Sequence, residues 1–232
     1  MKTKPGWFPR TGRTATAMLG AVILPMASHA ESTVRQAVEA LTNRDYDLAL
    51  KVRADDEILD RFEIEVDEMA IRLLAKAPLA SDLRLITVAM KISQNLERVG
   101  DEATKIAKRA RDLSQDPPLK LVLDIPRLAA LALGMMKEAL DAFVSQDATS
   151  ARELIPHDKQ VDALNREIHA RLLEQMTENV DTIPRCLHLM VAAKSLERIA
   201  DHAKNRAEEV VYLCEANDIR HTAGVRVAAP DQ

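Results

Sequence analysis

The chain has 232 residues, of which 47% are hydrophobic and 3% aromatic, and its formal net charge is −4. A nucleic-acid-binding protein normally shows a clear basic excess, so this balance argues against nucleic acid as a partner. Glycine is sparse, while alanine, leucine and charged residues are frequent, which is typical of a helical bundle. The length is sufficient for one domain or two small ones with a real core.

The N-terminal segment is open to two interpretations. Basic residues precede a short apolar run at 17–24, and small residues precede Glu31, which is the pattern of a secretory signal peptide. In the other interpretation, residues 14–41 form one amphipathic helix that is interrupted near Pro25. The apolar run is too short to span a bilayer. Residues 1–13 are predicted to be a disordered extension in front of the first repeat.

Three helices are predicted in the first half, because apolar residues recur there with helical spacing. They are expected at 14–41, 46–77 and from about 81 to 114. Pro78 ends the second helix, since proline disfavours helical geometry in the residue before it. Ser81 or Asp82 is predicted to cap the third helix. The stretch 115–118, which ends in two prolines, is the predicted linker.

The second half repeats this plan, and no stretch of the chain shows a strand pattern. Helices are expected at about 125–145, 149–179 and 183–217. Pro156 is predicted to kink the second of them, and Thr182 or Asp181 to cap the third, with Pro184 in its first turn. The fold class is therefore predicted to be all-α. Two tandem three-helix bundles, related by internal duplication, are expected over 14–114 and 119–217, followed by a flexible tail over 218–232.

Two stretches one hundred residues apart carry the duplication, Leu96–Asp101 (LERVGD) and Leu196–Asp201 (LERIAD). Each holds two carboxylates at i and i+4, which project from one face of a helix. The middle helix of each half holds another acidic pair at that spacing. If the two helices of a half are antiparallel neighbours, four carboxylates can converge. The two sets of four carboxylates are Asp56, Asp60, Glu97 and Asp101 in the first half, and Asp158, Asp162, Glu197 and Asp201 in the second.

Two interpretations of these acids stay open. Acidic pairs at this spacing are common on solvated helix faces, so any single pair is consistent with plain surface. Four close carboxylates, however, repel one another and call for a cation, and oxygen-only ligands suit Mg²⁺, Ca²⁺, Mn²⁺ or iron. A ferritin-like di-iron enzyme would need Glu-x-x-His, and none of the six histidines has a glutamate three residues before it. His202 is either a bystander or an outer metal ligand.

The sequence resembles the PhoU family, the regulators of bacterial phosphate uptake. The resemblance runs from about Met26 to Thr222 and is strongest in the two LER stretches. It also includes the segments at 80–86, 182–184 and 218–221. It implies two three-helix bundles and places Met26 in the first helix, which argues against cleavage after Ala30. One departure is that Gly100 of the first half is replaced by Ala200 in the second, so a close backbone approach is expected only in the first.

The resemblance further implies a non-catalytic, dimeric, cytoplasmic adaptor at the inner face of the membrane. Such proteins couple the ATPase subunit of the phosphate ABC transporter to a sensor histidine kinase, and repress phosphate-starvation genes when phosphate is plentiful. Some relatives bind iron or zinc clusters and others magnesium or manganese through Glu/Asp-x-x-x-Asp motifs, which implies that the two sets of carboxylates named above bind metal. Arg98 and Arg198 are the candidate partner-binding residues. The alternative is a metal-dependent phosphoester-processing enzyme on a helical bundle.

Overall fold

The computed structural model describes residues 10–76 and 79–220, and all its regular elements in these ranges are helical. The first bundle consists of α1 (Arg10–Asn43), α2 (Tyr46–Ala54), α3 (Glu57–Leu74) and α4 (Ala80–Ser114). The second consists of α5 (Ile125–Ser145), α6 (Ala148–Leu154), η1 (Ile155–His157), α7 (Asp158–Glu178), η2 (Val180–Thr182) and α8 (Ile183–Glu215). The predicted fold class, two tandem helical bundles related by duplication, is confirmed.

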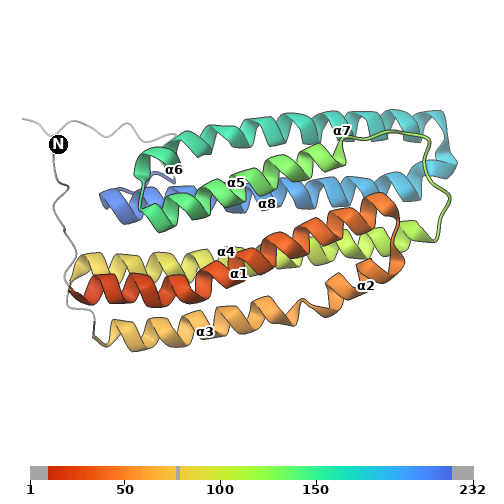
Figure 1. Ribbon diagram of the computed structural model, residues 1–232. Coiled ribbons are helices and arrows are strands. Elements are labelled where there is room, and N and C mark those ends of the chain that lie inside the picture. The colour runs from red at the N-terminus through yellow and green to blue at the C-terminus, as the bar shows by residue number, and fades with distance from the viewer. Residues whose placement is uncertain (1–9, 77–78, 221–232) are drawn as a thin grey trace, which may run out of the picture.

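The two bundles lie side by side along α4 and α8 (Figure 1). These helices are antiparallel, because a residue early in α4 meets a residue late in α8. Lys91 pairs with Glu209, and Glu102 pairs with Arg198. The repeated leucines Leu96 and Leu196 are fully buried, and burying each such side chain contributes about 1.5–3 kcal/mol. The LER stretches therefore lie in the middle of the molecule, with their leucines in its core.

The segment that was open to two interpretations belongs to α1. This helix begins at Arg10, ahead of the predicted start at Thr14, and continues through Pro25. Leu19, Ile23 and Met26 on this helix are fully buried in the core of the first bundle, whereas Met18 and Leu24 are exposed. The structure thus supports the helix interpretation of residues 14–41. Residues 1–9 of the predicted extension lie outside the described residues.

The middle helix of each half is broken, and the prediction of one continuous helix over 46–77 was wrong. Asp55 and Asp56 separate α2 from α3, whereas Pro156 lies in the short η1 that separates α6 from α7. The first break has no proline to reveal it. Its signal is the pair of aspartates, since acidic side chains favour the N-terminus of a helix over its interior. As a result Asp56 stands directly before α3 and Asp158 is the first residue of α7.

The turn that enters each short helix is also duplicated. Arg44 and Gln146 both adopt left-handed backbone geometry, with φ of 58° and 52°. The next residue caps the helix in both halves. Asp45 Oδ1 accepts from the backbone N–H of Leu48, and Asp147 Oδ1 accepts from that of Thr149, each at 2.9 Å. The duplication is therefore preserved in backbone detail as well as in topology.

The predicted cap of α4 was wrong, whereas Thr182 does occupy the N-cap position of α8, although its side chain makes no capping hydrogen bond to that helix. Leu79 precedes α4 without a side-chain cap, so Ser81 and Asp82 fall within the first turn. Asp82 is buried there, where an acidic group is favoured by the helix dipole. Before α8, Thr182 Oγ1 donates to the carbonyl oxygens of Gln175 and Asn179 and so closes the preceding turn. Pro184 is in the first turn of α8, as predicted.

Of the predicted flexible tail, residues 218–220 are described and 221–232 lie outside the described residues. Arg220 is held against α8, because its guanidinium donates to Glu209 Oε1 at 2.8 Å and also pairs with Asp218. The start of the tail is thus fixed to the second bundle. None of the described helices combines the length and the hydropathy needed to cross a membrane.

Candidate functional site: two acidic helix faces

The acidic set of the first half lies where the start of α3 faces the middle of α4. Asp56 Oδ1 accepts a hydrogen bond from Thr104 Oγ1 on α4 at 3.0 Å. Burial, with the nearby carboxylates of Asp101, Glu63 and Asp60, raises the pKa of Glu97 to about 7. Burial also raises the pKa of Asp101, where Asp56 and Asp60 add to the effect and Lys105 opposes it. The four predicted carboxylates of this half therefore interact electrostatically across α3 and α4.

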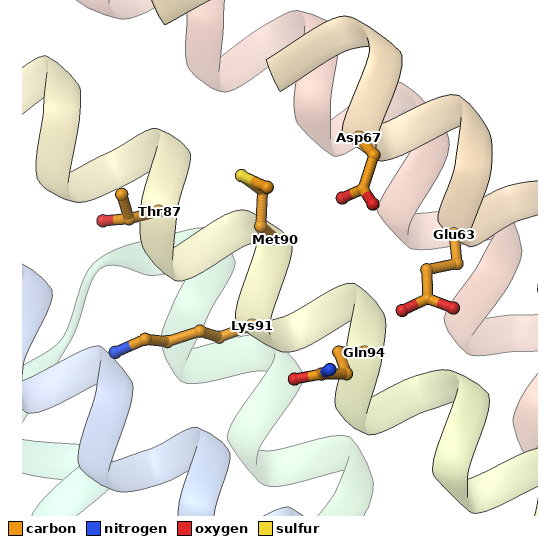
Figure 2. Close-up of a pocket in the computed structure, with 6 residues that line it drawn as sticks. All are labelled: Glu63, Asp67, Thr87, Met90, Lys91 and Gln94. Carbon is orange, nitrogen blue, oxygen red and sulfur yellow. The ribbon is translucent and has the colours of Figure 1, made fainter. Parts of the chain in front are cut away.

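Two further acids extend this face and were missed from the sequence. Glu63 and Asp67 continue the acidic spacing of Asp56 and Asp60 along α3, at intervals of three and four residues. They line a pocket of about 330 Å³ between α3 and α4 (Figure 2). The spacing was visible in the sequence. It was overlooked because the predicted sets kept only acids that recur in the second half.

The basic residue nearest this pocket does not neutralise it. Lys91 lies on the wall of the pocket, but its side chain extends away from Glu63 and Asp67 toward α8 (Figure 2). There Lys91 Nζ donates to both carboxylate oxygens of Glu209 at 3.0 Å. Within the pocket, the acids on α3 consequently face Thr87, Met90 and Gln94 of α4, which carry no charge. Outside the pocket, the positive charge of Arg98 opposes the rise in the pKa of Glu63 that burial causes.

The acidic set of the second half lies on an equivalent pair of helices, α7 and α8, but lysines pair with two of its carboxylates. Lys204 Nζ on α8 donates to Asp158 Oδ2 on α7 at 2.7 Å, and Lys194 forms an ion pair with Glu197. Burial raises the pKa of Asp201, as do Asp158 and Glu197, whereas Lys194 and Lys204 lower it. Asp162 lies one turn further along α7. Two lysines from α8 thus take part in this set.

Both acidic sets lie on duplicated pairs of helices, and comparison with known proteins shows which family has this duplication. The model of the PhoU domain matches the chain twice, at residues 23–110 and 125–210. This chain belongs to the PhoU family.

Relatives of known sequence and structure agree over most of the chain. The phosphate-specific transport system accessory protein PhoU homolog of Pseudomonas aeruginosa is 39% identical over 207 residues, which is 88% of this chain and 86% of that protein. The crystal structure of PhoU from Pseudomonas aeruginosa superimposes with a TM-score of 0.84 at 37% identity, covering 88% of this chain and 99% of that one. The crystal structure of the phosphate transport system regulatory protein PhoU from Streptococcus pneumoniae superimposes with a TM-score of 0.83 at 25% identity. The match covers 90% of this chain and 99% of that one.

The metal sets of this PhoU-family chain stay a prediction. Among residues 10–76 and 79–220, no three histidine, cysteine, aspartate or glutamate side chains stand close enough together to hold a metal ion. The carboxylates of each half share a helix pair without forming a closed set of ligands. In the first half, the chemistry still fits a hard cation, because only oxygen donors are present. Burial and the neighbouring carboxylates raise the pKa of Glu97 to about 7 even though Arg98 opposes them.

The candidate partner-binding arginines lie on the seam between the PhoU repeats. Arg198 is half-exposed and forms an ion pair with Glu102 at 3.4 Å. Arg98 is exposed beside a polar pocket of about 470 Å³ between α4 and α8. His202 also faces this seam, with its Nδ1 3.1 Å from Asn95 Oδ1. Its ring thus contacts an amide of α4, and its role as a bystander or an outer metal ligand stays a prediction.

Proposed function

We propose that this chain regulates phosphate transport as a non-catalytic adaptor. In this role it couples a phosphate ABC transporter, through the transporter's ATPase subunit, to a sensor histidine kinase. It represses phosphate-starvation genes when phosphate is plentiful. The observation that carries the proposal is the double match to the PhoU domain, because it covers both bundles. Relatives named as phosphate-specific transport accessory proteins support it over most of their length.

An adaptor binds other proteins through exposed surface, and the second bundle offers one suitable face. Ile183, Leu187 and Val191 follow one another at intervals of four along α8, and each is 36% exposed or more. A row of exposed apolar side chains on one helix face is typical of a protein interaction site. We assign this row, with Arg98 and Arg198, to the binding of partners. A second copy of the chain is among the partners proposed.

The proposed location is the cytoplasmic side of the inner membrane, where the chain is held by its partners. The proposed ligand of the first acidic face is a metal ion, Mg²⁺ or Mn²⁺ by the oxygen-only chemistry of its donors, or iron or zinc by the resemblance to metal-binding relatives. Asp56, Asp60, Glu97 and Asp101 would hold it. The ion would offset their repulsion and would fix α3 against α4.

The adaptor role is tested by deleting the coding sequence and following a phosphate-starvation reporter in medium rich in phosphate. We expect the reporter to be derepressed in the deletion strain and repressed again when the wild-type chain is supplied. Normal repression in the deletion strain would contradict the proposal. The alternative role as an enzyme is tested on the purified chain with Mn²⁺ and a phosphoester substrate. Turnover that is lost in Glu97→Gln would favour the enzyme.

A further inference from the structure

The two acidic faces differ at two positions that the duplication aligns. The LER stretches set an offset of one hundred residues between equivalent positions of α4 and α8. By this offset Gln94 is equivalent to Lys194, and Thr104 is equivalent to Lys204. Both positions of the first half are neutral, and both positions of the second half are lysines. The difference falls on the turns that flank the repeated Glu-x-x-x-Asp pairs.

The contacts made by these residues are equivalent. Thr104 reaches from α4 to Asp56 at the start of α3, with Oγ1 3.0 Å from Oδ1. Lys204 reaches from α8 to Asp158 at the start of α7, with Nζ 2.7 Å from Oδ2. A hydroxyl donates a hydrogen bond without changing the charge of the set, whereas an ammonium group adds a full positive charge.

The other aligned pair, Gln94 and Lys194, also has a neutral residue in the first half and a lysine in the second. Lys194 forms an ion pair with Glu197. Its counterpart Gln94 is uncharged and lines the pocket that contains Glu63 and Asp67 (Figure 2). In the described part of the chain, the repeated glutamate therefore has a lysine ion pair in the second half only. In the first half the positive charges of Arg98 and Lys105 act on Glu97 and Asp101 without an ion pair to either carboxylate among the described residues.

The number of acidic residues also differs between the two halves, which increases the difference in charge. Glu63 and Asp67 on α3 correspond to Asn165 and His169 on α7, at the offset of 102 residues that relates Asp56 to Asp158. The first face thus combines six carboxylates, Asp56, Asp60, Glu63, Asp67, Glu97 and Asp101, with neutral residues at positions 94 and 104. The second combines four carboxylates with two lysines.

We infer that Lys194 and Lys204 take the place of a metal ion in the second half, so that metal binding is confined to the first. Close carboxylates need a nearby cation, and in the second half the chain supplies its own. Asp158 has one buried oxygen, Oδ1, that makes no hydrogen bond within the described part of the chain. Lys204 pairs with the other oxygen of Asp158 and Lys194 pairs with Glu197, so two of the four carboxylates of this set already have an ammonium partner. Mg²⁺ or Ca²⁺, which takes six or more oxygen ligands, would have to displace both lysines. This inference rests on the metal binding proposed for the first half.

The test compares matched amide variants of the full-length chain. The protein is stripped of metal with EDTA, and Mn²⁺ binding is measured by equilibrium dialysis with elemental analysis. Glu97→Gln with Asp101→Asn is expected to lose the Mn²⁺ bound by the wild type. Glu197→Gln with Asp201→Asn is expected to keep it. Equal losses of bound Mn²⁺ in the two variants would overturn the inference, because the carboxylates of the second half would then also bind the ion.

A reciprocal exchange tests the lysines directly. Lys194→Gln with Lys204→Thr gives the second half the neutral residues of the first and is expected to bind about one Mn²⁺ more per chain than the wild type. Gln94→Lys with Thr104→Lys is expected to lose the binding of the first half. Circular dichroism melts establish that each variant is folded. A folded Lys194→Gln/Lys204→Thr variant that binds no additional Mn²⁺ would overturn the inference, and if it does not fold, the amide variants decide alone.

The same measurements separate this inference from the proposal on which it rests. A wild-type chain that binds no Mn²⁺ would remove the metal from the proposed function. In that case metal binding by the first half falls with it, and the lysine exchange decides only the role of the lysines. A gain of binding shows that they exclude the ion from the second half, and the absence of a gain contradicts it.

Discussion

Gly100 on α4 packs so tightly against Leu59 on α3 that a Cβ atom at Gly100 would lie 2.3 Å from Leu59 Cδ1. Leu59 is almost fully buried. At the aligned positions of the second half the chain has Ala200 and Val161. In the second half, the larger Ala200 on α8 is thus accompanied by the smaller Val161 on α7. This pair sets how closely α3 and α4 approach, next to the carboxylates of Glu97 and Asp101.

Gly100→Ala is therefore expected to destabilise the protein. Forcing a methyl group into a filled core costs about 1–3 kcal/mol, and the better helix propensity of alanine offsets about 1 kcal/mol of it. The expected net loss is about 1 kcal/mol in the free energy of unfolding, measured by urea denaturation. A variant as stable as the wild type would show that Leu59 can move aside.

The second half supplies the compensating change. Leu59→Val alone is expected to lose about 1 kcal/mol from the cavity it leaves. Combined with Gly100→Ala it recreates the pair found at Val161 and Ala200, and the double variant is expected to be more stable than the sum of the single losses by about 1 kcal/mol. Strict additivity in the double-mutant cycle would mean that the two residues do not share one packing site.

Glu97 is expected to make stability fall as the pH rises. Its pKa is raised from the ordinary 4.5 to about 7, first by burial and then by Asp101 and other carboxylates. Between these values the folded state holds a proton that the unfolded chain has released, so stability is lost as the pH rises from about 4.5 through 7. Glu97→Gln, which stays neutral, is expected to be more stable than the wild type at pH 8. The gain is under about 1 kcal/mol, because solvent screens a half-exposed charge.

The matched control for this measurement is Glu197→Gln. Glu197 has Lys194 as an ion-pair partner, so its neutralisation removes an attraction and is expected to bring no gain in stability at pH 8. Thermal melts of both variants between pH 4 and pH 9 check the sign. A gain of similar size in the two variants would show that the lysines do not distinguish the two halves.

The sequence predicted those parts of the structure that repeat. The LER stretches gave the duplication, the helical spacing gave the bundles, and the resemblance gave the family. The features that differ between the halves could not be predicted in the same way. The break at Asp55 and Asp56 has no proline. The role of Lys204 depends on its contact with Asp158, which lies forty-six residues earlier in the sequence on another helix. Glu63 does not belong to the duplicated pattern, because its counterpart in the second half is Asn165.

His202 is expected to stay neutral at physiological pH and well below it. Burial, followed by the positive charges of Arg206 and Arg98, lowers its pKa from 6.5 to about 4. Stability contributed by the neutral ring is present above pH 6.5 and is lost as the pH falls toward 4. NMR titration of the His202 ring is expected to show its midpoint near 4, with the proton on the nitrogen that faces Asn95. A midpoint near 6.5 would place the ring in contact with solvent.

Arg206 is expected to reduce stability, and its replacement to increase it. The residue is 1% exposed, and none of its three guanidinium nitrogens makes a hydrogen bond within the described part of the chain. Burial lowers its pKa to about 10, so the group is still charged at neutral pH. At the aligned position the first half has Ile106, which is fully buried. Arg206→Met is expected to raise the free energy of unfolding by about 1–3 kcal/mol, because replacing buried charge by packed apolar groups is often stabilising.

The control for Arg206 is Arg198→Met, at a half-exposed arginine that is paired with Glu102 on the same helix seam. Loss of that pair is expected to cost up to about 1 kcal/mol. Urea denaturation of both variants at pH 7 gives the comparison. A loss of stability in Arg206→Met would show that the folded protein provides the guanidinium with a partner, a bound anion or ordered water between α4 and α8. Loss of that stabilisation in buffer free of phosphate would then identify the anion.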